Sequence, residues 1–243
     1  MTNPYLSVVI PAYNEAQRIG RTLERIQEYL LAQDFSAEIV VVLDGGTDNT
    51  AQVVNDFAAE LPIKLIDRKE NRGKGYTVRE GMLAATGAVR LFTDADNATD
   101  IGHFDKMKTF WEQGKHVVIA SRDSKDSEGE WQAVPQSFKK RVMGNLGNLF
   151  IQLVAVPGIW DTQCGFKGFS AEATQKIFPQ LEADGFTLDV EALALARKYG
   201  YDVSIVPAHW INDDRSKVKP IDYVKVLLGT LKIRWNLIRG RYQ

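Results

Sequence analysis

The sequence contains very few of the side chains that build disulfides or zinc sites. Its 243 residues include one cysteine, Cys164, and three histidines. A single cysteine cannot form a disulfide within the chain, and this composition provides no zinc-binding cluster. A reducing compartment is the simplest setting for such a protein.

Long apolar runs are also missing. The first residues, MTNPYLSVVIPAYNE, lack the basic start of a signal peptide, and Pro11 and Asn14 interrupt their apolar run. The segment 146–160 comes closest to a membrane span but contains two amides and Pro157. It falls short of the roughly 18 uninterrupted apolar residues that a spanning helix needs, so we expect no such helix.

Neither sign of charge dominates the chain. Lys plus Arg is 30 and Asp plus Glu is 31, which gives a formal net charge of −1. A generic nucleic-acid-binding protein would show a clearly basic domain, so we expect no nucleic-acid partner. With 44% hydrophobic and 25% charged residues, the composition is that of a globular protein and excludes collagen-like and disordered classes.

Short apolar runs alternate with helical patterns in the first half of the chain. The runs are rich in β-branched residues and predict buried strands at 6–10, 39–43, 63–66, 89–93 and 117–120. Apolar residues at helical spacing predict helices over 14–32, 48–60, 73–86 and 100–114. Because parallel neighbours need a crossover connection, the order predicts an α/β fold with a mostly parallel central sheet and helices on both faces.

The second half follows a less regular pattern. The polar segment 121–136 predicts a long surface loop. After it we expect a helix ending near Val154, strand structure within 161–170, a helix over 189–199, a strand over 202–206 and a final helix over 221–239. No linker divides the chain, so we expect a single domain over residues 1–243.

Polar side chains follow the predicted strands directly. In an open parallel sheet the ligand crevice lies outside the carboxyl ends of the strands, so these residues should gather at one edge. The side chains with binding or catalytic chemistry at these positions are Tyr13, Glu15, Asp44, Lys74, Asp94, Asp96 and Arg122.

Two common nucleotide-binding motifs are absent. The first predicted strand is not followed by G-x-G-x-x-G, and Gly73-Lys74-Gly75 continues as Tyr76-Thr77-Val78, which is not a P-loop. Dinucleotide-dependent dehydrogenases and P-loop NTPases are therefore disfavoured.

Asp94 and Asp96 supply another way to hold phosphates. Residues two apart in a strand point to the same face, so the two carboxylates can converge on one hard cation. Mg²⁺ or Mn²⁺ bound by such a pair would complete its shell with water and phosphate oxygens. The alternative is a solvated acidic turn that caps the helix beginning near Asp100.

Three other residues at this edge allow two interpretations each. Asp44 could accept hydrogen bonds from a base or act only in a turn. Tyr13 could pack against a base or cover the edge of the core. Lys74, near a helix N-terminus, suits an anionic ligand, although it could also be a solvated lysine.

The motifs of the chain resemble those of family 2 glycosyltransferases of the GT-A type. They include SVVIPAYNEAQRI, VVLDGGTDNT, NRGKGYTVREGM, FTDADNAT, DTQCGFKGFS and FTLDVEALALA, in this order. Within the family the chain looks most like polyprenyl-phosphate sugar synthases, and NRGKG-x-x-VR-x-GM, DADNAT and SKV-x-P are similar to dolichyl-phosphate β-glucosyltransferases. The resemblance implies a Rossmann-like GT-A sheet with a C-terminal acceptor-side elaboration.

The resemblance also assigns roles to individual residues. It implies that the nucleotide-sugar site is formed by Pro11, Tyr13, Glu15, Asp44, Lys74, Asp94, Ala95 and Asp96. Asp94 and Asp96 would hold Mg²⁺ or Mn²⁺ on the donor pyrophosphate. Residues near the acceptor phosphate would be Arg122, Ser216 and Lys217. Gln163 lies in the segment lining the sugar site, and Asp189 matches the catalytic carboxylate, so we expect catalytic roles for Asp189, Arg122 and Gln163.

The chain departs from the family pattern in two places. The usual D-D-G-S-x-D segment reads Leu43-Asp44-Gly45-Gly46-Thr47-Asp48, which has one carboxylate fewer. The sequence also lacks the N-terminal anchor of eukaryotic dolichyl-phosphate glucosyltransferases, which favours a bacterial or archaeal polyprenyl phosphate as acceptor.

We therefore expect an inverting, metal-dependent transfer of a hexose, with glucose favoured, from a UDP-sugar to a polyprenyl phosphate such as dolichyl or undecaprenyl phosphate. The alternatives are a hydroxyl acceptor on a glycan, protein or small molecule, or GDP-mannose as donor. Residues 1–120 would bind the nucleotide sugar, and residues 121–218 would carry the acceptor and catalytic groups.

The segment 219–243 adds a membrane hypothesis. It carries six Lys or Arg residues against Asp222 alone, with apolar residues at helical spacing. A basic amphipathic helix with Trp235 suits the surface of an anionic bilayer, whereas packing of its apolar face on the core is the alternative. We expect a cytoplasmic enzyme attached peripherally to the inner face of the membrane.

Overall fold

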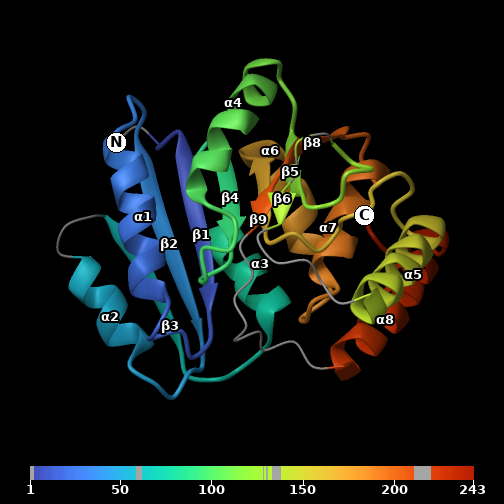
Figure 1. Ribbon diagram of the computed structural model, residues 1–243, viewed down its shortest axis with the longest axis horizontal. Coiled ribbons are helices and arrows are strands. Elements are labelled where there is room, and N and C mark those ends of the chain that lie inside the picture. The colour runs from blue at the N-terminus through green and yellow to red at the C-terminus, as the bar shows by residue number, and fades with distance from the viewer. Residues whose placement is uncertain (1–2, 59–61, 128, 130, 133–137, 211–219) are drawn as a thin grey trace.

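The computed structural model describes residues 3–58, 62–127, 129, 131–132, 138–210 and 220–243. A seven-stranded sheet forms its centre (Figure 1), in the order β3-β2-β1-β4-β7-β5-β8. The strands are β1 (Leu6–Ala12), β2 (Ala37–Asp44), β3 (Ile63–Arg68), β4 (Val89–Thr93), β5 (Val117–Ser121), β7 (Phe166–Ser170) and β8 (Val203–Pro207). All of them pair in parallel except β7, which runs antiparallel to β4 and β5. The predicted α/β fold is confirmed.

Helices cover both faces of the sheet because successive strand residues point to opposite sides. In β1, Val8 and Ile10 belong to one apolar core and Val9 to the other. The first core includes residues of α1 (Ile19–Leu31), α2 (Thr50–Phe57) and α4 (Phe104–Glu112). The second includes residues of α3 (Lys74–Ala84), α6 (Ala171–Ile177) and α7 (Leu188–Lys198). The short helices η1 (Ile101–His103) and η2 (Phe178–Gln180) adjoin α4 and α6.

Two further helices, α5 (Phe138–Val154) and α8 (Pro220–Ile238), pack together beside the β8 end of the sheet (Figure 1). A second, two-stranded sheet pairs β6 (Trp131–Gln132) with β9 (His209–Trp210). The expectation of a plain loop over 121–136 was therefore wrong at β6. Its partner lies in a distant part of the chain, so local polarity alone did not indicate the strand.

The helix predicted over 14–32 begins later, at Ile19. Asn14 has a positive φ of 53°, and its side-chain oxygen accepts hydrogen bonds from the backbone of Thr47 and Asp48. These bonds tie the segment after β1 to the segment after β2. The residues before Ile19 therefore form a turn at the sheet edge instead of the first turns of a helix.

None of the helices in the described parts of the chain is sufficiently long and apolar to traverse a bilayer.

Candidate active site

The candidate site lies at the sheet edge where β1, β2, β4 and β5 end. Because β7 is antiparallel, it begins at this same edge, which brings the preceding segment 161–165 next to the end of β4. The N-terminal turn of α7 adds Asp189. Side chains from both halves of the chain therefore meet here.

The turn after β1 contributes Tyr13 and Glu15. The two Glu15 carboxylate oxygens each lie 2.7 Å from a nitrogen of the Arg18 guanidinium, and the Glu15 side chain is almost fully buried. Tyr13 is 42% exposed, while Pro11 lies within β1 with intermediate burial. Glu15 therefore orders the entry to α1, and Tyr13 presents an aromatic ring at the edge.

Asp44, the last residue of β2, organises the start of α3. Its carboxylate accepts hydrogen bonds from the backbone nitrogens of Arg72, at 2.8 Å, and Gly73, at 2.9 Å. It also lies 2.5 Å from the Arg68 guanidinium. Gly73 has a φ of 94°, which a glycine adopts readily. Together these contacts fix the position of Lys74, the first residue of α3.

Lys74 pairs with the segment after β4 and feels the charge of Asp189 on α7. Its Nζ lies 2.6 Å from Asp94 Oδ1. Burial acts to lower the pKa of Lys74, but the charges of Asp94 and Asp189 outweigh burial and raise this pKa above its usual value. Asp94 and Asp189 therefore lie near one ammonium, although they are far apart in the sequence.

Asp96 completes a pair of carboxylates. Burial and the neighbouring Asp94 charge raise the pKa of Asp96, despite a hydrogen bond from the Ala98 backbone nitrogen and the Arg18 guanidinium 3.8 Å away. The carboxylate pair thus carries negative charge that a cation would stabilise. Ala95, the residue between the two aspartates, is buried, and its backbone carbonyl accepts a hydrogen bond from the Thr22 hydroxyl at 2.8 Å.

Gly165 makes room for Asp94. The Asp94 backbone nitrogen donates to the Gly165 carbonyl at 3.2 Å, which holds the two segments together. A Cβ atom at position 165 would lie only 2.0 Å from Asp94 Oδ2. The present Asp94 side-chain conformation therefore requires glycine at position 165.

The donor set fits a divalent cation such as Mg²⁺ or Mn²⁺. Asp94 and Asp96 supply carboxylate oxygens. Asp94 already pairs with one positive charge, the Lys74 ammonium. No cluster of three His, Cys, Asp or Glu side chains suited to a metal occurs in the described parts of the chain. An ion held by these two carboxylates would therefore need oxygens from water and a phosphate ligand, which is how Mg²⁺ is commonly bound.

Asp189 is paired with a buried lysine that the sequence did not single out. Lys167 Nζ lies 2.6 Å from Asp189 Oδ1, and the two side chains are 0% and 4% exposed. The same ammonium donates to the Cys164 carbonyl. One carboxylate oxygen of Asp189 therefore accepts a hydrogen bond from a lysine on β7.

Arg122, which follows β5, is held by Asp161. Its guanidinium donates to both carboxylate oxygens at 2.7 and 2.8 Å, and its backbone nitrogen donates to the same carboxylate at 3.0 Å. Asp126 accepts hydrogen bonds from the backbone nitrogens of Trp160 and Asp161, at 2.7 and 2.8 Å. The segments 121–126 and 160–161 therefore form one hydrogen-bonded unit.

We predict that Asp161→Asn destabilises the protein by at least about 2 kcal/mol near neutral pH. Burial alone would raise the pKa of Asp161, but the charge and hydrogen bonds of Arg122 outweigh it and lower this pKa from 3.8 to about 2. The stabilisation is present above the unfolded pKa and is lost as pH falls through the folded one. In urea unfolding, the free energy of unfolding of the variant should therefore lie below that of the wild type by a constant amount from pH 5 to 8. The difference should shrink as the pH falls from 4 toward 2. A deficit unchanged at pH 2 would contradict this assignment.

The remaining predicted residues divide into two groups. Gln163 lies next to this unit, where its backbone nitrogen donates to Asp161, and its buried Nε2 has no hydrogen-bond partner among the described residues. Ser216 and Lys217 lie outside the described residues. Their acceptor-phosphate role stays a prediction.

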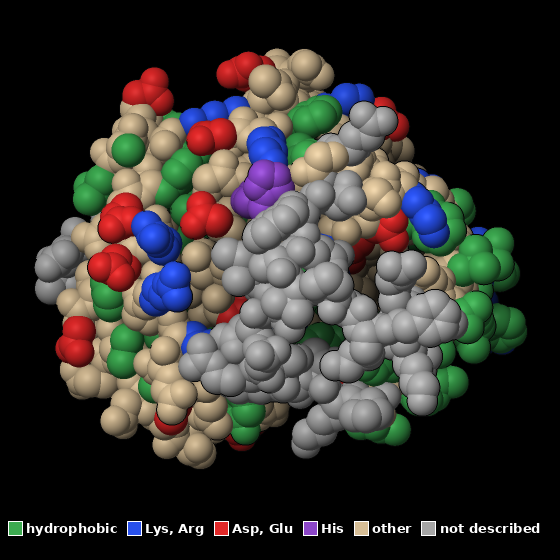
Figure 2. Space-filling model, viewed as in Figure 1, with side chains coloured by type: hydrophobic (Ala, Val, Ile, Leu, Met, Phe, Trp, Pro, Cys, Tyr) green, Lys and Arg blue, Asp and Glu red, His purple; other side chains and the backbone are tan. Residues whose placement is uncertain are grey.

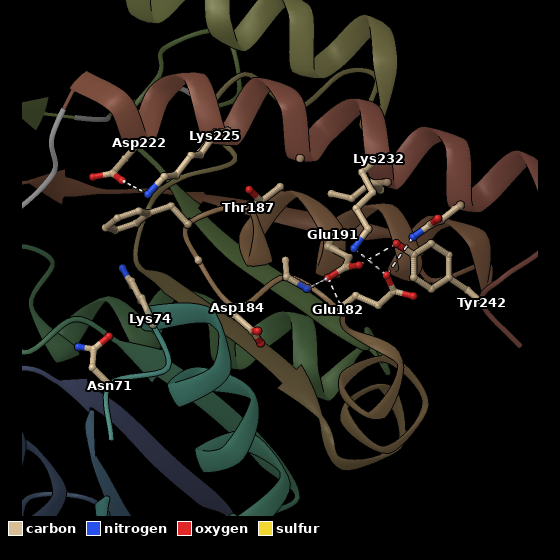
Figure 3. A pocket seen from close by; sticks show the side chains of 18 residues that line it. Asn71, Lys74, Glu182, Asp184, Thr187, Glu191, Asp222, Lys225, Lys232 and Tyr242 are labelled. Atoms are coloured by element: carbon tan, nitrogen blue, oxygen red, sulfur yellow. Dashed lines mark hydrogen bonds and ion pairs between the residues drawn. The ribbon is translucent and has the colours of Figure 1, made fainter. Parts of the chain in front are cut away.

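A cavity of about 450 Å³ opens beside Lys74, between the segment 182–187 and α8. Lys74 and Asn71 reach it from the N-terminal half of the chain, whereas Lys225 and Lys232 reach it from α8 (Figure 3). At its far end Glu191 accepts hydrogen bonds from the Tyr242 hydroxyl and the Ala183 backbone nitrogen (Figure 3). Burial raises the pKa of Glu191. Glu191 of α7 thus ties the residues that follow α8 to α7 and to the segment that precedes α7.

Sequence reasoning missed Asp161, Gly165 and Lys167, although it named the segment that contains them. Lys167 carried the clearest signal, because a lysine lies between Phe166 and Gly168 in an otherwise apolar strand pattern. A charged residue at such a position is rarely buried without a partner.

Residues 7–178 match the family model described as Glycosyl transferase family 2. The dolichyl-phosphate β-glucosyltransferase of Dictyostelium discoideum is 33% identical, over 98% of this chain and 76% of its own length. The enzyme of that name from Saccharomyces cerevisiae is 32% identical, over 98% of this chain and 77% of its own length. The resemblance stated from the motifs is therefore confirmed.

Solved structures share the fold at low identity. The glucosyl-3-phosphoglycerate synthase of Mycobacterium tuberculosis, in complex with Mg²⁺ and UDP, gives a TM-score of 0.69 at 17% identity, covering 95% of this chain and 79% of that one. The mannosyl-3-phosphoglycerate synthase of Rubrobacter xylanophilus gives a TM-score of 0.69 at 19% identity, covering 99% and 76%. These similarities support the predicted GT-A type sheet.

Proposed function

Because this chain belongs to glycosyltransferase family 2, we propose that it transfers glucose from UDP-glucose to a polyprenyl phosphate and inverts the anomeric configuration. Glycosyl transfer follows from the family. The names of the relatives, dolichyl-phosphate β-glucosyltransferases, support the lipid-phosphate acceptor and the β-linked glucose. The proposal depends most on one observation, the Lys74 ammonium 2.6 Å from Asp94 at the sheet edge, where the charges of Asp189 and Asp96 also act on it.

Each residue at the sheet edge has a role in this proposal. Tyr13 packs against the base of the donor, and Asp44 holds the turn that borders the nucleotide. Lys74 attracts the diphosphate, while Gln163 belongs to the segment that lines the sugar site. Arg122, with Ser216 and Lys217, binds the acceptor phosphate, and its bidentate pairing with Asp161 keeps the guanidinium oriented.

Asp94 and Asp96 would hold Mg²⁺ or Mn²⁺. When bound, the ion supplies charge stabilisation for the UDP leaving group. The acceptor phosphate is already ionised near neutral pH, so it needs no strong base to attack the anomeric carbon. Asp189 instead orients and stabilises the reacting sugar. With a hydroxyl acceptor, Asp189 would have to take the proton.

The decisive experiment is a donor and acceptor screen. Release of UDP or GDP is measured with UDP-glucose, other UDP-hexoses and GDP-mannose, in Mn²⁺, with and without a short polyprenyl phosphate. We expect UDP release from UDP-glucose only with the lipid phosphate. Activity on a sugar or protein hydroxyl without lipid would replace the proposed acceptor, and a preference for GDP-mannose would replace the proposed donor.

We further propose that α8, together with α5, lies against the cytoplasmic face of the membrane. The inward side of α8 is buried at Thr230, Ile233 and Asn236. Its outward side carries an apolar stripe at helical spacing, formed by Val224, Leu228, Leu231, Trp235 and Ile238. Exposed leucines of α5 extend this surface, and green side chains gather over the same region in Figure 2. One face of α8 therefore packs on the protein while another remains exposed.

We predict that the double variant Leu228→Glu/Trp235→Glu binds anionic vesicles at least tenfold more weakly than the wild type. Both side chains are more than half exposed, so the change should leave the fold intact and remove apolar contact with the bilayer. Co-sedimentation with vesicles of anionic and neutral phospholipid measures the effect. Leu31→Glu is the matched control, because Leu31 is an exposed leucine on α1, away from the stripe. Equal binding of all three proteins would exclude the stripe as the contact surface.

A further inference from the structure

Lys167 is an unusual residue for the centre of a sheet. It lies on β7, paired in register with Phe92 on β4 and Ile119 on β5, and its side chain is completely buried. Its ammonium contacts the Asp189 carboxylate and the Cys164 carbonyl, and it lies 5.4 Å from the centre of the Phe92 ring. The lysine thus reaches from the sheet to the first turn of α7.

Such an arrangement is costly unless the geometry is good. Removing an ammonium from water costs several kcal/mol, and a hydrophobic pair of similar volume often serves stability as well or better. A purely structural explanation for Lys167 is therefore weak. The specific consequence of the pair is that one carboxylate oxygen of Asp189 is fixed in place.

We propose that Lys167 is a positioning residue for glycosyl transfer, because its ammonium holds the Asp189 carboxylate in one orientation at the N-terminal turn of α7. The inference rests on the proposed function, in which Asp189 faces the reacting sugar. Lys167 itself is buried beneath Asp189 and acts only through this carboxylate.

The orientation of the Asp189 carboxylate affects the charged residues around it. Asp189 acts electrostatically on Lys74, which pairs with Asp94. Lys167, Asp189, Lys74 and Asp94 therefore form a series of alternating charges from the buried sheet to the predicted metal site. A rotation of Asp189 would disturb the field at the sugar, while Lys74 would keep its direct partner Asp94.

A double-mutant cycle tests the proposal. The variants are Lys167→Met, Asp189→Asn and the two together, and steady-state kinetics are measured with donor and acceptor varied in turn. We expect Lys167→Met to lower kcat about 100-fold and to change the donor KM less than threefold, because misplacing a catalytic group reduces turnover. In the Asp189→Asn background, Lys167→Met should cause less than a threefold further loss. Fully multiplicative losses would overturn the proposal, because Lys167 would then act independently of Asp189.

A further variant and a stability measurement guard against a folding defect. Lys167→Met leaves a buried carboxylate without its ammonium and could fail to fold, whereas the double variant removes both charges. Lys167→Gln retains a hydrogen-bond donor but loses the charge, so its kcat should lie about tenfold above that of Lys167→Met and about tenfold below that of the wild type. If Lys167→Met does not fold, the comparison is made between Lys167→Gln and the wild type, where an unchanged kcat would reject the proposal.

Arg90 provides the matched control. It is a buried cation in the same sheet, but it donates to the carbonyls of Met82 and Gly87. Arg90→Gln should lower the melting temperature and leave the kcat of the folded protein unchanged. An equal loss of kcat in Arg90→Gln would show that general destabilisation explains the Lys167 result. If the wild type transfers no sugar to lipid phosphate, the proposed function is wrong. Non-additive changes in melting temperature across the cycle would still show that Lys167 and Asp189 interact.

Discussion

Alanine at either Asp94 or Asp96 is expected to reduce glycosyl transfer by at least about 10³-fold, because each variant loses one of the two carboxylates assigned to the divalent ion. In Asp94→Ala the effect is compounded, because the Lys74 ammonium loses its partner 2.6 Å away and remains as a positive charge beside the ion. In Asp96→Ala this pairing persists, so any residual activity should be greater there.

The measurement is UDP release over a titration of Mn²⁺ and Mg²⁺. Asp56→Ala is a suitable control, because Asp56 is an exposed aspartate on α2 that bonds only Gln52 among the described residues. Wild-type and control activity should require added metal and be removed by EDTA. Activity within tenfold of the wild type in either alanine variant would argue against the assigned metal ligands.

Asp189→Asn is the second change with a large expected effect, a fall in kcat of about 10²- to 10³-fold. The amide preserves the shape of the side chain and can still accept a hydrogen bond from Lys167. Because the buried ammonium loses its counter-charge, the variant should be less stable, and kcat is compared below its melting temperature. What disappears is the negative charge near the reacting sugar. Donor KM should change little, because the residues assigned to the nucleotide lie on other elements.

The acceptor dependence separates two roles for Asp189. If it orients and stabilises the sugar, the loss should be similar across phosphate acceptors of different chain length. If it takes a proton, the loss should be greatest with a hydroxyl acceptor, and an added small-molecule base should restore part of the rate. Asp202→Asn, at an exposed aspartate paired with Lys115, is the control. Undiminished turnover in Asp189→Asn would remove this residue from both roles.

The sheet could be predicted from the sequence because its strands are short, buried and rich in β-branched residues. The residues at their carboxyl ends could be predicted for the same reason, since parallel strands present these ends at a common edge. The sequence therefore predicts the position of Asp44, Asp94 and Arg122 at this edge.

The contacts beneath the site could not be predicted in this way. Lys167 pairs with a residue 22 positions away and Arg122 with one 39 positions away. Hydrophobic periodicity describes which face of an element is buried, but it carries no information about such partners. The start of α1 was misplaced for a related reason, because Asn14 bonds to Thr47 across the sheet edge instead of within its own helix.

The position of β7 also constrains how the chain reaches its folded state during synthesis. β5 ends at Ser121, but in the sheet it is separated from β4 by β7, which begins only at Phe166. A ribosome must therefore add a further stretch of chain before β5 and β8 can join the strands already formed. A nascent chain ending near residue 120 has an unpaired β4 edge that is open to wrong partners. A fragment that ends near residue 120 should consequently be prone to aggregation. The two fragments should form the folded protein only if both are present together during folding.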